Sequence, residues 1–224
     1  MIEYSLTHSK RKTVGIYIRD GKVEVRAPLK YPKSEIDQFV ASKEKWIVNN
    51  LAKSQKQAKQ KAAFALNYGD TISFRGTAYP LVTKVGKRAG FDGECFYLPP
   101  KLESDLIRDV CVKIYRHLAK KHLTDRVAIY AEKMGVTPAD VKINSAKTRW
   151  GSCSSQKNIN FSWRLIMADD DVIDYAVVHE LAHIIQMNHS EKFWLTVENV
   201  LPDYKMCKVR LQKLQKRLAT EDWG

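Results

Sequence analysis

The first hundred residues alternate between apolar and polar positions in short runs, which predicts small antiparallel strand pairs. In residues 13–19 and 22–27 every second side chain is apolar, the period of a half-buried strand. Asp20-Gly21 lies between the two runs, and this dipeptide favours the two-residue turn of a hairpin. Further strand-like runs cover residues 71–75, 78–85 and 95–98. A second hairpin is therefore expected to turn near Arg75-Gly76.

A helical period separates these two hairpins. Ser34-Glu35-Ile36-Asp37 has the form of a capping box, and apolar side chains then recur with helical spacing as far as Leu51. The Lys/Gln/Ala-rich segment 53–61 is expected to continue this helix in solvent or to act as a linker. Pro99-Pro100 then interrupts the strand pattern. We therefore expect two domains, residues 1–100 and residues 101–224.

Helical periods dominate the second domain. Ser104 begins a long one that Gly135 is expected to end, because glycine readily adopts the left-handed conformation found after helices. From Val172 to Met187 the chain is apolar almost all round, which is typical of a buried helix, and Asp169-Asp170-Asp171 supplies its cap. Extended runs are expected at residues 141–144, 147–151 and 159–166, and further helices at residues 192–200 and 204–218. This order of elements predicts an α+β fold.

The expected buried helix contains His179-Glu180-Leu181-Ala182-His183, which has the spacing of a zinc site. A helix rises about 5.4 Å per turn, and residues four apart lie on one face about one turn apart, so both imidazoles can reach one ion. Glu180 lies beside them and can take a proton from a water that the metal activates. His189 must leave the helix to supply a third ligand, and Asn188, which tolerates a left-handed backbone, is expected to make the turn. Three imidazoles and an open position predict a catalytic Zn²⁺ site.

The charge of the chain is high and unevenly distributed. Its net charge is +13, and residues 1–98 hold 18 Lys+Arg against 9 Asp+Glu. Such asymmetry indicates either a polyanionic partner such as nucleic acid or a solvated basic face. No apolar stretch reaches membrane-spanning length, and residues 1–12 lack the apolar segment of a signal peptide. The 4 cysteines are widely spaced, as expected for free thiols in a reducing compartment, so we expect a cytoplasmic protein without membrane contact.

Several segments, taken in order, resemble a known family. They are the stretch from Asp20 to Pro28, Arg149-Trp150-Gly151-Ser152-Cys153, the run from Asp174 to His183, and Asn188-His189-Ser190 with Phe193-Trp194. The chain is similar in these segments to the YgjP-like metal-dependent hydrolases, which are related to the WLM and SprT-like zinc metalloproteases. The resemblance implies a zincin-like catalytic domain whose metal helix lies under a small twisted sheet. It also implies that His179, His183 and His189 are the ligands and that Glu180 is the general base.

The residues that select the substrate are expected on strands near the metal. In zincins an edge strand pairs with an extended peptide, and either residues 159–164 or residues 147–152 fit that edge. Lys147, Arg149 and Arg164 are cationic; they either bind phosphate groups or form a solvated strand face. Tyr204 follows the third histidine, and its hydroxyl is expected either to stabilise an oxyanion or to pack on the core.

These observations lead to one preferred function and two alternatives. The preferred function is a zinc-dependent hydrolase that acts on peptides. The first alternative is a metal-dependent nucleotide phosphohydrolase, because the chain is basic and a pyrophosphatase activity on UTP has been ascribed to the resembling family. The second is a DNA-associated protease, as among the WLM and SprT-like relatives. The motif alone does not choose, since an activated water serves an amide and a phosphoanhydride alike.

Overall fold

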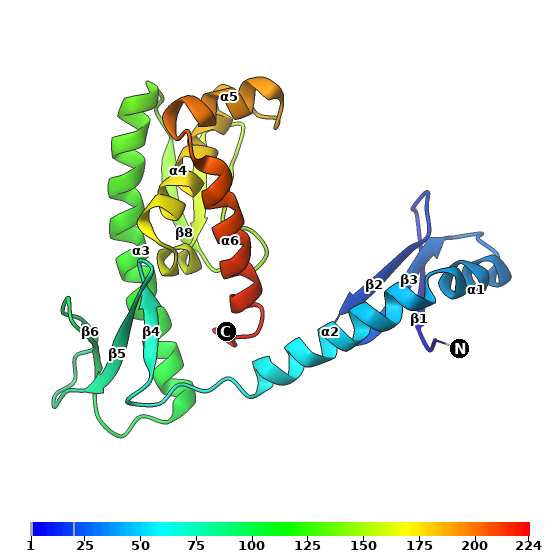
Figure 1. The fold of residues 1–224 in the computed structure, drawn as a ribbon, viewed down its shortest axis with the longest axis horizontal. Coiled ribbons are helices and arrows are strands. Elements are labelled where there is room, and N and C mark those ends of the chain that lie inside the picture. The colour runs from blue at the N-terminus through cyan, green and yellow to red at the C-terminus, as the bar shows by residue number, and fades with distance from the viewer. Residues whose placement is uncertain (1, 20) are drawn as a thin grey trace. The chain divides into compact units, whose positions relative to one another are not determined.

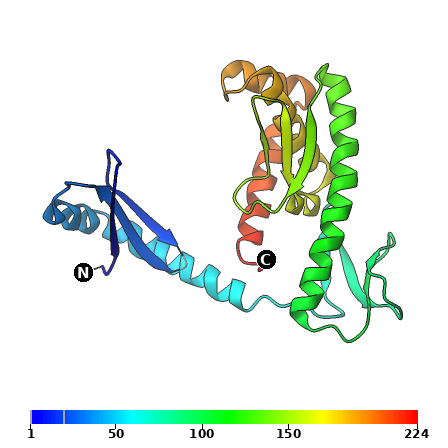
Figure 2. The same ribbon diagram turned by 180° about the vertical axis from the view of Figure 1, so that it is seen from behind.

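A computed structural model describes residues 2–19 and 21–224 of the chain. Six α-helices, one short 3-10 helix and three small mixed sheets occur in the described residues, which confirms the α+β class. The chain divides into two compact units, residues 1–64 with 218–222 and residues 65–217 with 223–224. Figures 1 and 2 show their elements from opposite sides. No helix within the described ranges combines the length and apolar character needed to cross a membrane.

The first unit is built on a three-stranded sheet of order β1-β3-β2. Its strands are β1 (Ser5–Ser9), β2 (Gly15–Arg19) and β3 (Lys22–Pro28). Strands β2 and β3 form the expected hairpin, with Arg19 opposite Lys22; Gly21 has a φ of 73°, and Asp20 lies outside the described residues. Strand β1 pairs in parallel with β3 and was not predicted, because Leu6 is its single apolar residue and its pairing depends on tertiary contacts.

Two helices, α1 (Lys33–Ser42) and α2 (Glu44–Ala62), lie on one side of this sheet (Figures 1 and 2). The buried core between the sheet and the helices comprises Val23, Val25, Ala27, Ile36, Val40 and Ile47. The expected single helix is broken at Lys43, whose φ of −107° and ψ of 10° lie outside the helical range. The predicted capping box is wrong, since Pro32 occupies the N-cap position and no side chain caps α1. Helix α2 does continue through the polar segment 53–61.

A four-stranded sheet of order β4-β5-β7-β6 begins the second unit. Its strands are β4 (Thr71–Phe74), β5 (Thr77–Thr83), β6 (Gly90–Phe91) and β7 (Phe96–Leu98). The expected turn of its hairpin is present, with left-handed φ values at Arg75 and Gly76. The long helix α3 (Ser104–Met134) packs against β7, and the rings of Phe96 and Tyr115 lie 5.4 Å apart. These strands therefore belong with α3, and the chain divides near residue 64 instead of at the boundary expected near residue 100.

The remaining elements surround one buried helix. They are β8 (Asp140–Asn144), β9 (Gly151–Cys153), β10 (Asn158–Ser162), the 3-10 helix η1 (Trp163–Met167), α4 (Asp170–Ile185), α5 (Glu191–Val200) and α6 (Tyr204–Leu218). The sheet β8-β10-β9 lies on one side of α4, and α6 lies on the other (Figures 1 and 2). The strand expected over residues 159–166 ends at Ser162, because all five residues of η1 are buried, whereas a strand would turn alternate side chains outward.

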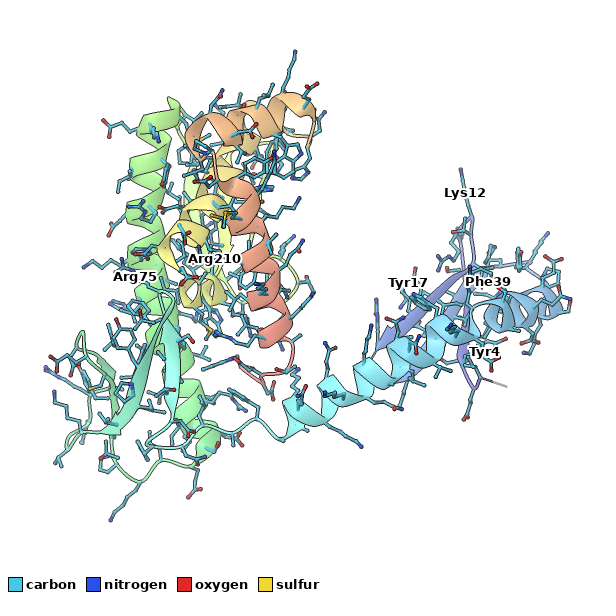
Figure 3. The ribbon with its side chains drawn as sticks, viewed as in Figure 1. Tyr4, Lys12, Tyr17, Phe39, Arg75 and Arg210 are labelled. Atoms are coloured by element: carbon cyan, nitrogen blue, oxygen red, sulfur yellow. The ribbon has the colours of Figure 1, made fainter. Side chains whose placement is uncertain are left out.

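Ion pairs fix the N-terminal end of α4. Arg75 donates two hydrogen bonds, of 2.7 and 2.6 Å, to the carboxylate of Asp170. Arg210 of α6, which is labelled in Figure 3, pairs with both Asp169 and Asp171. The three aspartates were expected to cap the helix, but no side chain caps α4, and Asp169 serves this ion pair instead. The first turn of α4 is thus held by the β4–β5 turn and by α6.

A second bidentate ion pair, between Arg126 and Asp174, holds α4 one turn further on. The guanidinium of Arg126 in α3 donates to both oxygens of Asp174, at 2.6 and 2.7 Å, and the hydroxyl of Tyr130 donates to the same carboxylate at 2.9 Å. The side chains of Arg126 and Asp174 are only 26% and 13% exposed. Partly buried bidentate pairs of this kind fix orientation as well as position.

Candidate metal centre

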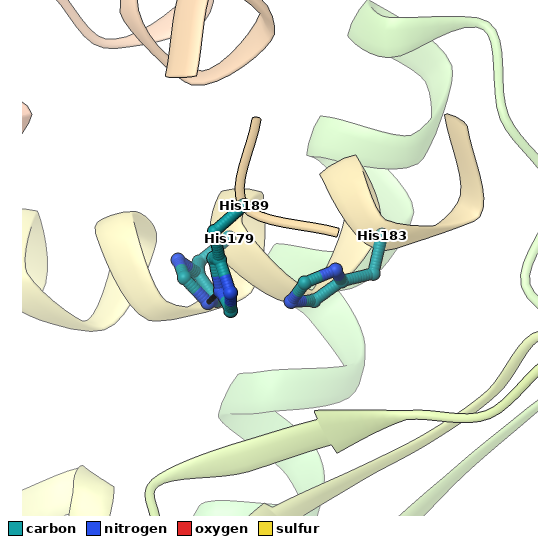
Figure 4. A group of neighbouring side chains, drawn as sticks. All are labelled: His179, His183 and His189. Atoms are coloured by element: carbon teal, nitrogen blue, oxygen red, sulfur yellow. Dashed lines mark hydrogen bonds between the residues drawn. The ribbon is translucent and has the colours of Figure 1, made fainter. Parts of the chain in front are cut away.

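Three imidazoles lie together at the C-terminal end of α4 (Figure 4). His179 and His183 project from consecutive turns of the helix, and His189 comes from the segment that follows it. One nitrogen of each lies within 4.8 Å of the others. Nε2 of His189 is 3.1 Å from Nε2 of His179, so these two nitrogens point at a common position. The structure therefore brings the three expected ligands together.

The exit from α4 explains how His189 reaches this position. The helix ends at Ile185, and Gln186 is extended, with a φ of −140° and a ψ of 105°. Nδ1 of His183 lies 3.3 Å from the carbonyl oxygen of Gln186, which leaves Nε2 of His183 for a ligand. The expected left-handed turn at Asn188 is wrong, because Asn188 has no positive φ. Instead, Gln186 leaves the helix in an extended conformation and donates a side-chain hydrogen bond of 2.9 Å to Asn188.

Burial favours the neutral form of the imidazoles of His179 and His183. Desolvation, reinforced by the other two histidines and by Lys208, lowers the pKa of His179 to about 3. Desolvation also lowers the pKa of His183. Neutral imidazole is the form that binds a metal, so the interior prepares these side chains as ligands.

A fully buried phenyl ring packs against all three histidines. The centroid of Phe193 lies 4.9 Å from the ring of His179, 4.6 Å from His183 and 4.7 Å from His189. Phe193 was considered only as part of the family resemblance. The signal that could have identified it is its place four residues after His189, on the buried side of α5, where it faces back toward α4.

Trp194 forms a wall on another side of the histidines. Its ring stacks on His189 at 5.7 Å and on Tyr204 at 5.4 Å. Tyr204 is buried and also stacks on Tyr175, which in turn contacts His179. In the described part of the chain, none of the ring contacts of Tyr204 is with a histidine. Tyr204 therefore supports the wall from behind, and its role at an oxyanion stays a prediction.

Glu180 lies buried beneath strand β9. Its Oε2 is a buried oxygen without a hydrogen-bond partner, and desolvation raises its pKa to about 7, against the opposing effect of Arg149. A Cβ atom on Gly151 would lie 2.5 Å from Oε1 of Glu180. Strand β9 therefore runs directly across Glu180, and at this position only glycine leaves room for the carboxylate.

The three cations expected to bind substrate lie in different surroundings. Arg149 is exposed in the loop before β9, close enough to Glu180 to lower its pKa. Lys147 is exposed, and its carbonyl oxygen accepts a hydrogen bond of 2.9 Å from Gln215 of α6. Arg164 is buried and donates to two main-chain oxygens, of Ser145 at 3.0 Å and of Gly224 at 2.8 Å. The guanidinium of Arg164 is thus engaged inside the protein and does not lie on a solvated strand face, and a substrate contact from Arg164 stays a prediction.

Comparison with known proteins identifies the family. A family model described as a YgjP-like metallopeptidase domain matches residues 12–214. The chain belongs to this family. This confirms the resemblance found in the sequence and makes the protein a metal-dependent hydrolase. The YgjP-like match covers strands β2 and β3 and both helices of the first unit, together with the histidine cluster.

Two solved structures are similar to part of the YgjP-like chain. The metallopeptidase zymogen of Pyrococcus abyssi abylysin is 24% identical, with a TM-score of 0.39, over 41% of this chain and 92% of the other. The metallopeptidase zymogen of Methanocaldococcus jannaschii jannalysin is 22% identical, with a TM-score of 0.36, over 42% of this chain and 95% of the other. No curated protein matches the sequence.

The residues present fit the divalent metal that a YgjP-like metallopeptidase implies. Three imidazole nitrogens meet within ligand-forming reach, and a buried carboxylate oxygen of the adjacent Glu180 has no hydrogen-bond partner. Buried polar atoms are seldom left in this state unless a ligand or water satisfies them. The group found among the described residues comprises three histidines, and three protein ligands with an open position are typical of a catalytic zinc site, as opposed to a structural one.

Proposed function

We propose that the protein is a zinc-dependent peptidase in which His179, His183 and His189 hold the ion and Glu180 is the general base. The observation that supports this proposal best is the position of β9. Within the described residues β9 is an edge strand of the sheet β8-β10-β9, and Gly151 on it touches Glu180. An extended peptide that paired with this free edge would therefore pass beside the carboxylate.

Strand pairing favours one of the two edge strands considered from the sequence. Strand β10 lies between β8 and β9, so residues 159–162 have partners on both sides. Residues 151–153 pair only with β10 in the described chain. Main-chain groups of β9 are therefore the donors and acceptors that we assign to the backbone of the substrate.

Each residue of the site has a distinct task in this proposal. A zinc ion held by the three histidines would supply Lewis-acid activation of water and of the substrate carbonyl. Glu180, whose pKa burial raises to about 7, accepts a proton from the attacking water and delivers it to the leaving amine. Phe193 and Trp194 fix the imidazole rings and exclude water from behind them.

A substrate screen tests the proposal directly. Zinc-loaded protein and its Glu180→Gln variant are offered casein, a library of internally quenched peptides and UTP. We expect peptide-bond cleavage that falls by roughly 10²–10⁴-fold in Glu180→Gln, while that variant keeps its zinc. UTP hydrolysis that depends on Glu180, with peptides left intact, would overturn the peptidase proposal and establish the nucleotide phosphohydrolase.

Two further measurements examine how the substrate is bound. A peptide substrate with N-methyl groups on the amides that face β9 should lose most of its kcat/KM, because methylation removes the donors of strand pairing. Replacing the exposed Arg149 by Ala should matter little for neutral peptides and should raise KM for substrates with acidic side chains. Full cleavage of the N-methylated peptide would exclude binding by strand pairing.

A further inference from the structure

We propose that the open face of the sheet β1-β3-β2 binds single-stranded nucleic acid through a cluster of arginines around Tyr17. The first unit is the most basic part of the chain, since residues 1–64 hold 14 Lys+Arg against 6 Asp+Glu. Nothing in the metal centre explains this charge, because the histidine cluster lies in the second unit. The distribution of the charge within the first unit gives the reason for the proposal.

Three guanidinium groups surround a single tyrosine ring. The central carbons of Arg11, Arg19 and Arg26 lie 5.7, 5.7 and 5.0 Å from the centroid of Tyr17. Among the described residues, the carboxylate of Glu24 lies close to these arginines and accepts two hydrogen bonds from Arg26. We call these three arginines and Tyr17 the Tyr17 cluster. Because one carboxylate faces three guanidinium groups, the Tyr17 cluster keeps an excess of positive charge.

Local packing fixes the Tyr17 cluster in place. A terminal nitrogen of Arg11 donates to the hydroxyl of Tyr17 at 3.3 Å. Gly15 makes this possible, because a Cβ atom there would lie 2.8 Å from that nitrogen and 3.2 Å from the hydroxyl. Nε of Arg11 is buried and has no hydrogen-bond partner. These contacts hold Arg11 against the ring of Tyr17.

The Tyr17 cluster lies on the face of the sheet that the helices leave open. Strand register places Tyr17 opposite Glu24 and Gly15 opposite Arg26, so these side chains share one face. The intervening residues, Val23 and Val25 among them, form the buried core with α1 and α2 on the other face. Figure 3 shows Tyr17 on the sheet and Lys12 on the loop between β1 and β2.

Charge complementarity selects the partner. A phosphate backbone is the polyanion that arginine binds best, because its planar guanidinium donates two parallel hydrogen bonds to phosphate oxygens. Single strands are bound by grooves or sheet faces that combine such cations with an aromatic ring or guanidinium planes on which bases stack. The Tyr17 cluster offers both on one small, open face, whereas a duplex would present only its phosphates.

Fluorescence anisotropy with a labelled oligo(dT) of about 20 nucleotides tests this proposal on the full-length protein. The cluster variant carries Gln in place of Arg11, Arg19 and Arg26. We expect its affinity to fall by more than about tenfold and the slope of log K against log salt to become shallower by about 2, since each lost phosphate contact removes about 0.7. Arg19→Gln alone, a change at an exposed position, should make the slope shallower by about 0.7.

A charge-matched control separates the Tyr17 cluster from general electrostatics. Lys45, Lys56 and Lys59 are exposed on α2, which packs on the other face of the sheet. Replacing these three by Gln removes the same charge and should leave the affinity within about twofold of wild type. Tyr17→Leu should weaken single-strand binding by about tenfold, because base stacking is lost, and should leave duplex binding unchanged.

Four results would overturn the proposal. Wild-type protein that does not bind oligo(dT) would do so at once. Equal losses in the arginine and lysine variants would mean that net charge alone attracts the strand. Duplex binding as tight as single-strand binding, with Tyr17→Leu silent, would remove the single-strand assignment. Arginine-dependent binding to phosphatidylserine vesicles without oligonucleotide binding would assign the face to a membrane surface.

Discussion

The substitution Gly151→Ala tests whether the position of Glu180 sets the rate of hydrolysis. The added methyl group would lie 2.5 Å from Oε1, 2.6 Å from Cγ and 2.7 Å from Cδ of Glu180. Since ordinary contacts begin at about 3.5 Å, the carboxylate has to move by about 1 Å. A displacement of this size at a reacting group costs on the order of 10²-fold in rate. Gly151 has no positive φ, so alanine suits its backbone and the expected loss of stability is only the overpacking cost of about 1–3 kcal/mol.

The assay measures kcat on a cleaved peptide together with zinc content and thermal stability. We expect Gly151→Ala to reduce kcat by about 100-fold, with zinc still bound at one ion per chain. Gly90→Ala is the matched control: Gly90 is also a strand residue without positive φ, and its added Cβ would lie 2.8 Å from the hydroxyl of Tyr97. The control should change stability to a similar degree and leave kcat unchanged.

A double mutant decides whether the effect passes through Glu180. In a Glu180→Gln background the base is already absent, so Gly151→Ala should cause no further loss of kcat. The reasoning is refuted if Gly151→Ala keeps wild-type kcat with full zinc. It is also refuted if its loss adds in full to that of Glu180→Gln, because Gly151 would then act through something other than the carboxylate.

Three further predictions concern the metal and the helix that carries it. His189→Ala should lose its zinc, as measured by plasma mass spectrometry, because two imidazoles remain; full zinc content would show that another residue is the third ligand. Adding zinc to metal-free protein should stabilise the fold by about 4 kcal/mol at a free concentration of a thousand times Kd, and a flat melting temperature across a zinc titration would contradict this. Asp174→Ala should lower the free energy of unfolding by about 2–3 kcal/mol in urea titrations, because it leaves the largely buried guanidinium of Arg126 without its carboxylate. A loss of less than about 0.5 kcal/mol in the free energy of unfolding is what an exposed ion pair gives, and it would mean that water replaces the Arg126–Asp174 pair at no cost.

The sequence predicted those features whose cause is local. His179 and His183 meet because four residues make about one turn of a helix, whatever surrounds it. The hairpin that joins β2 and β3 follows from alternating side chains on either side of a turn dipeptide, and Gly135 ends α3 through its own backbone freedom, with a φ of 64°. The candidate ligands His179 and His183, the buried helix that carries them and the family were therefore available without a structure.

Contacts between distant segments were decided only by the tertiary structure. Arg164 looked like a surface cation on a strand, but the buried run of η1 turns it toward the carbonyl oxygens of Ser145 and Gly224. The pairing of β1 with β3 and the division near residue 64 depend in the same way on which surfaces bury one another. The hydrophobic periodicity of a segment shows which of its faces is apolar, but it does not show which other segment covers that face.

The contact between Gly151 and Glu180 shows this difference most clearly. The sequence makes Glu180 a candidate base through its place beside two histidines, and it makes Gly151 only one glycine in a short strand. The sheet packs on α4 so that the backbone of Gly151, which has no side chain, contacts the carboxylate of Glu180. This packing buries the carboxylate, and the burial raises its pKa to about 7. Helix geometry thus brought His179 and His183 together, and the packing of β9 on α4 determined the space and the solvation in which Glu180 lies.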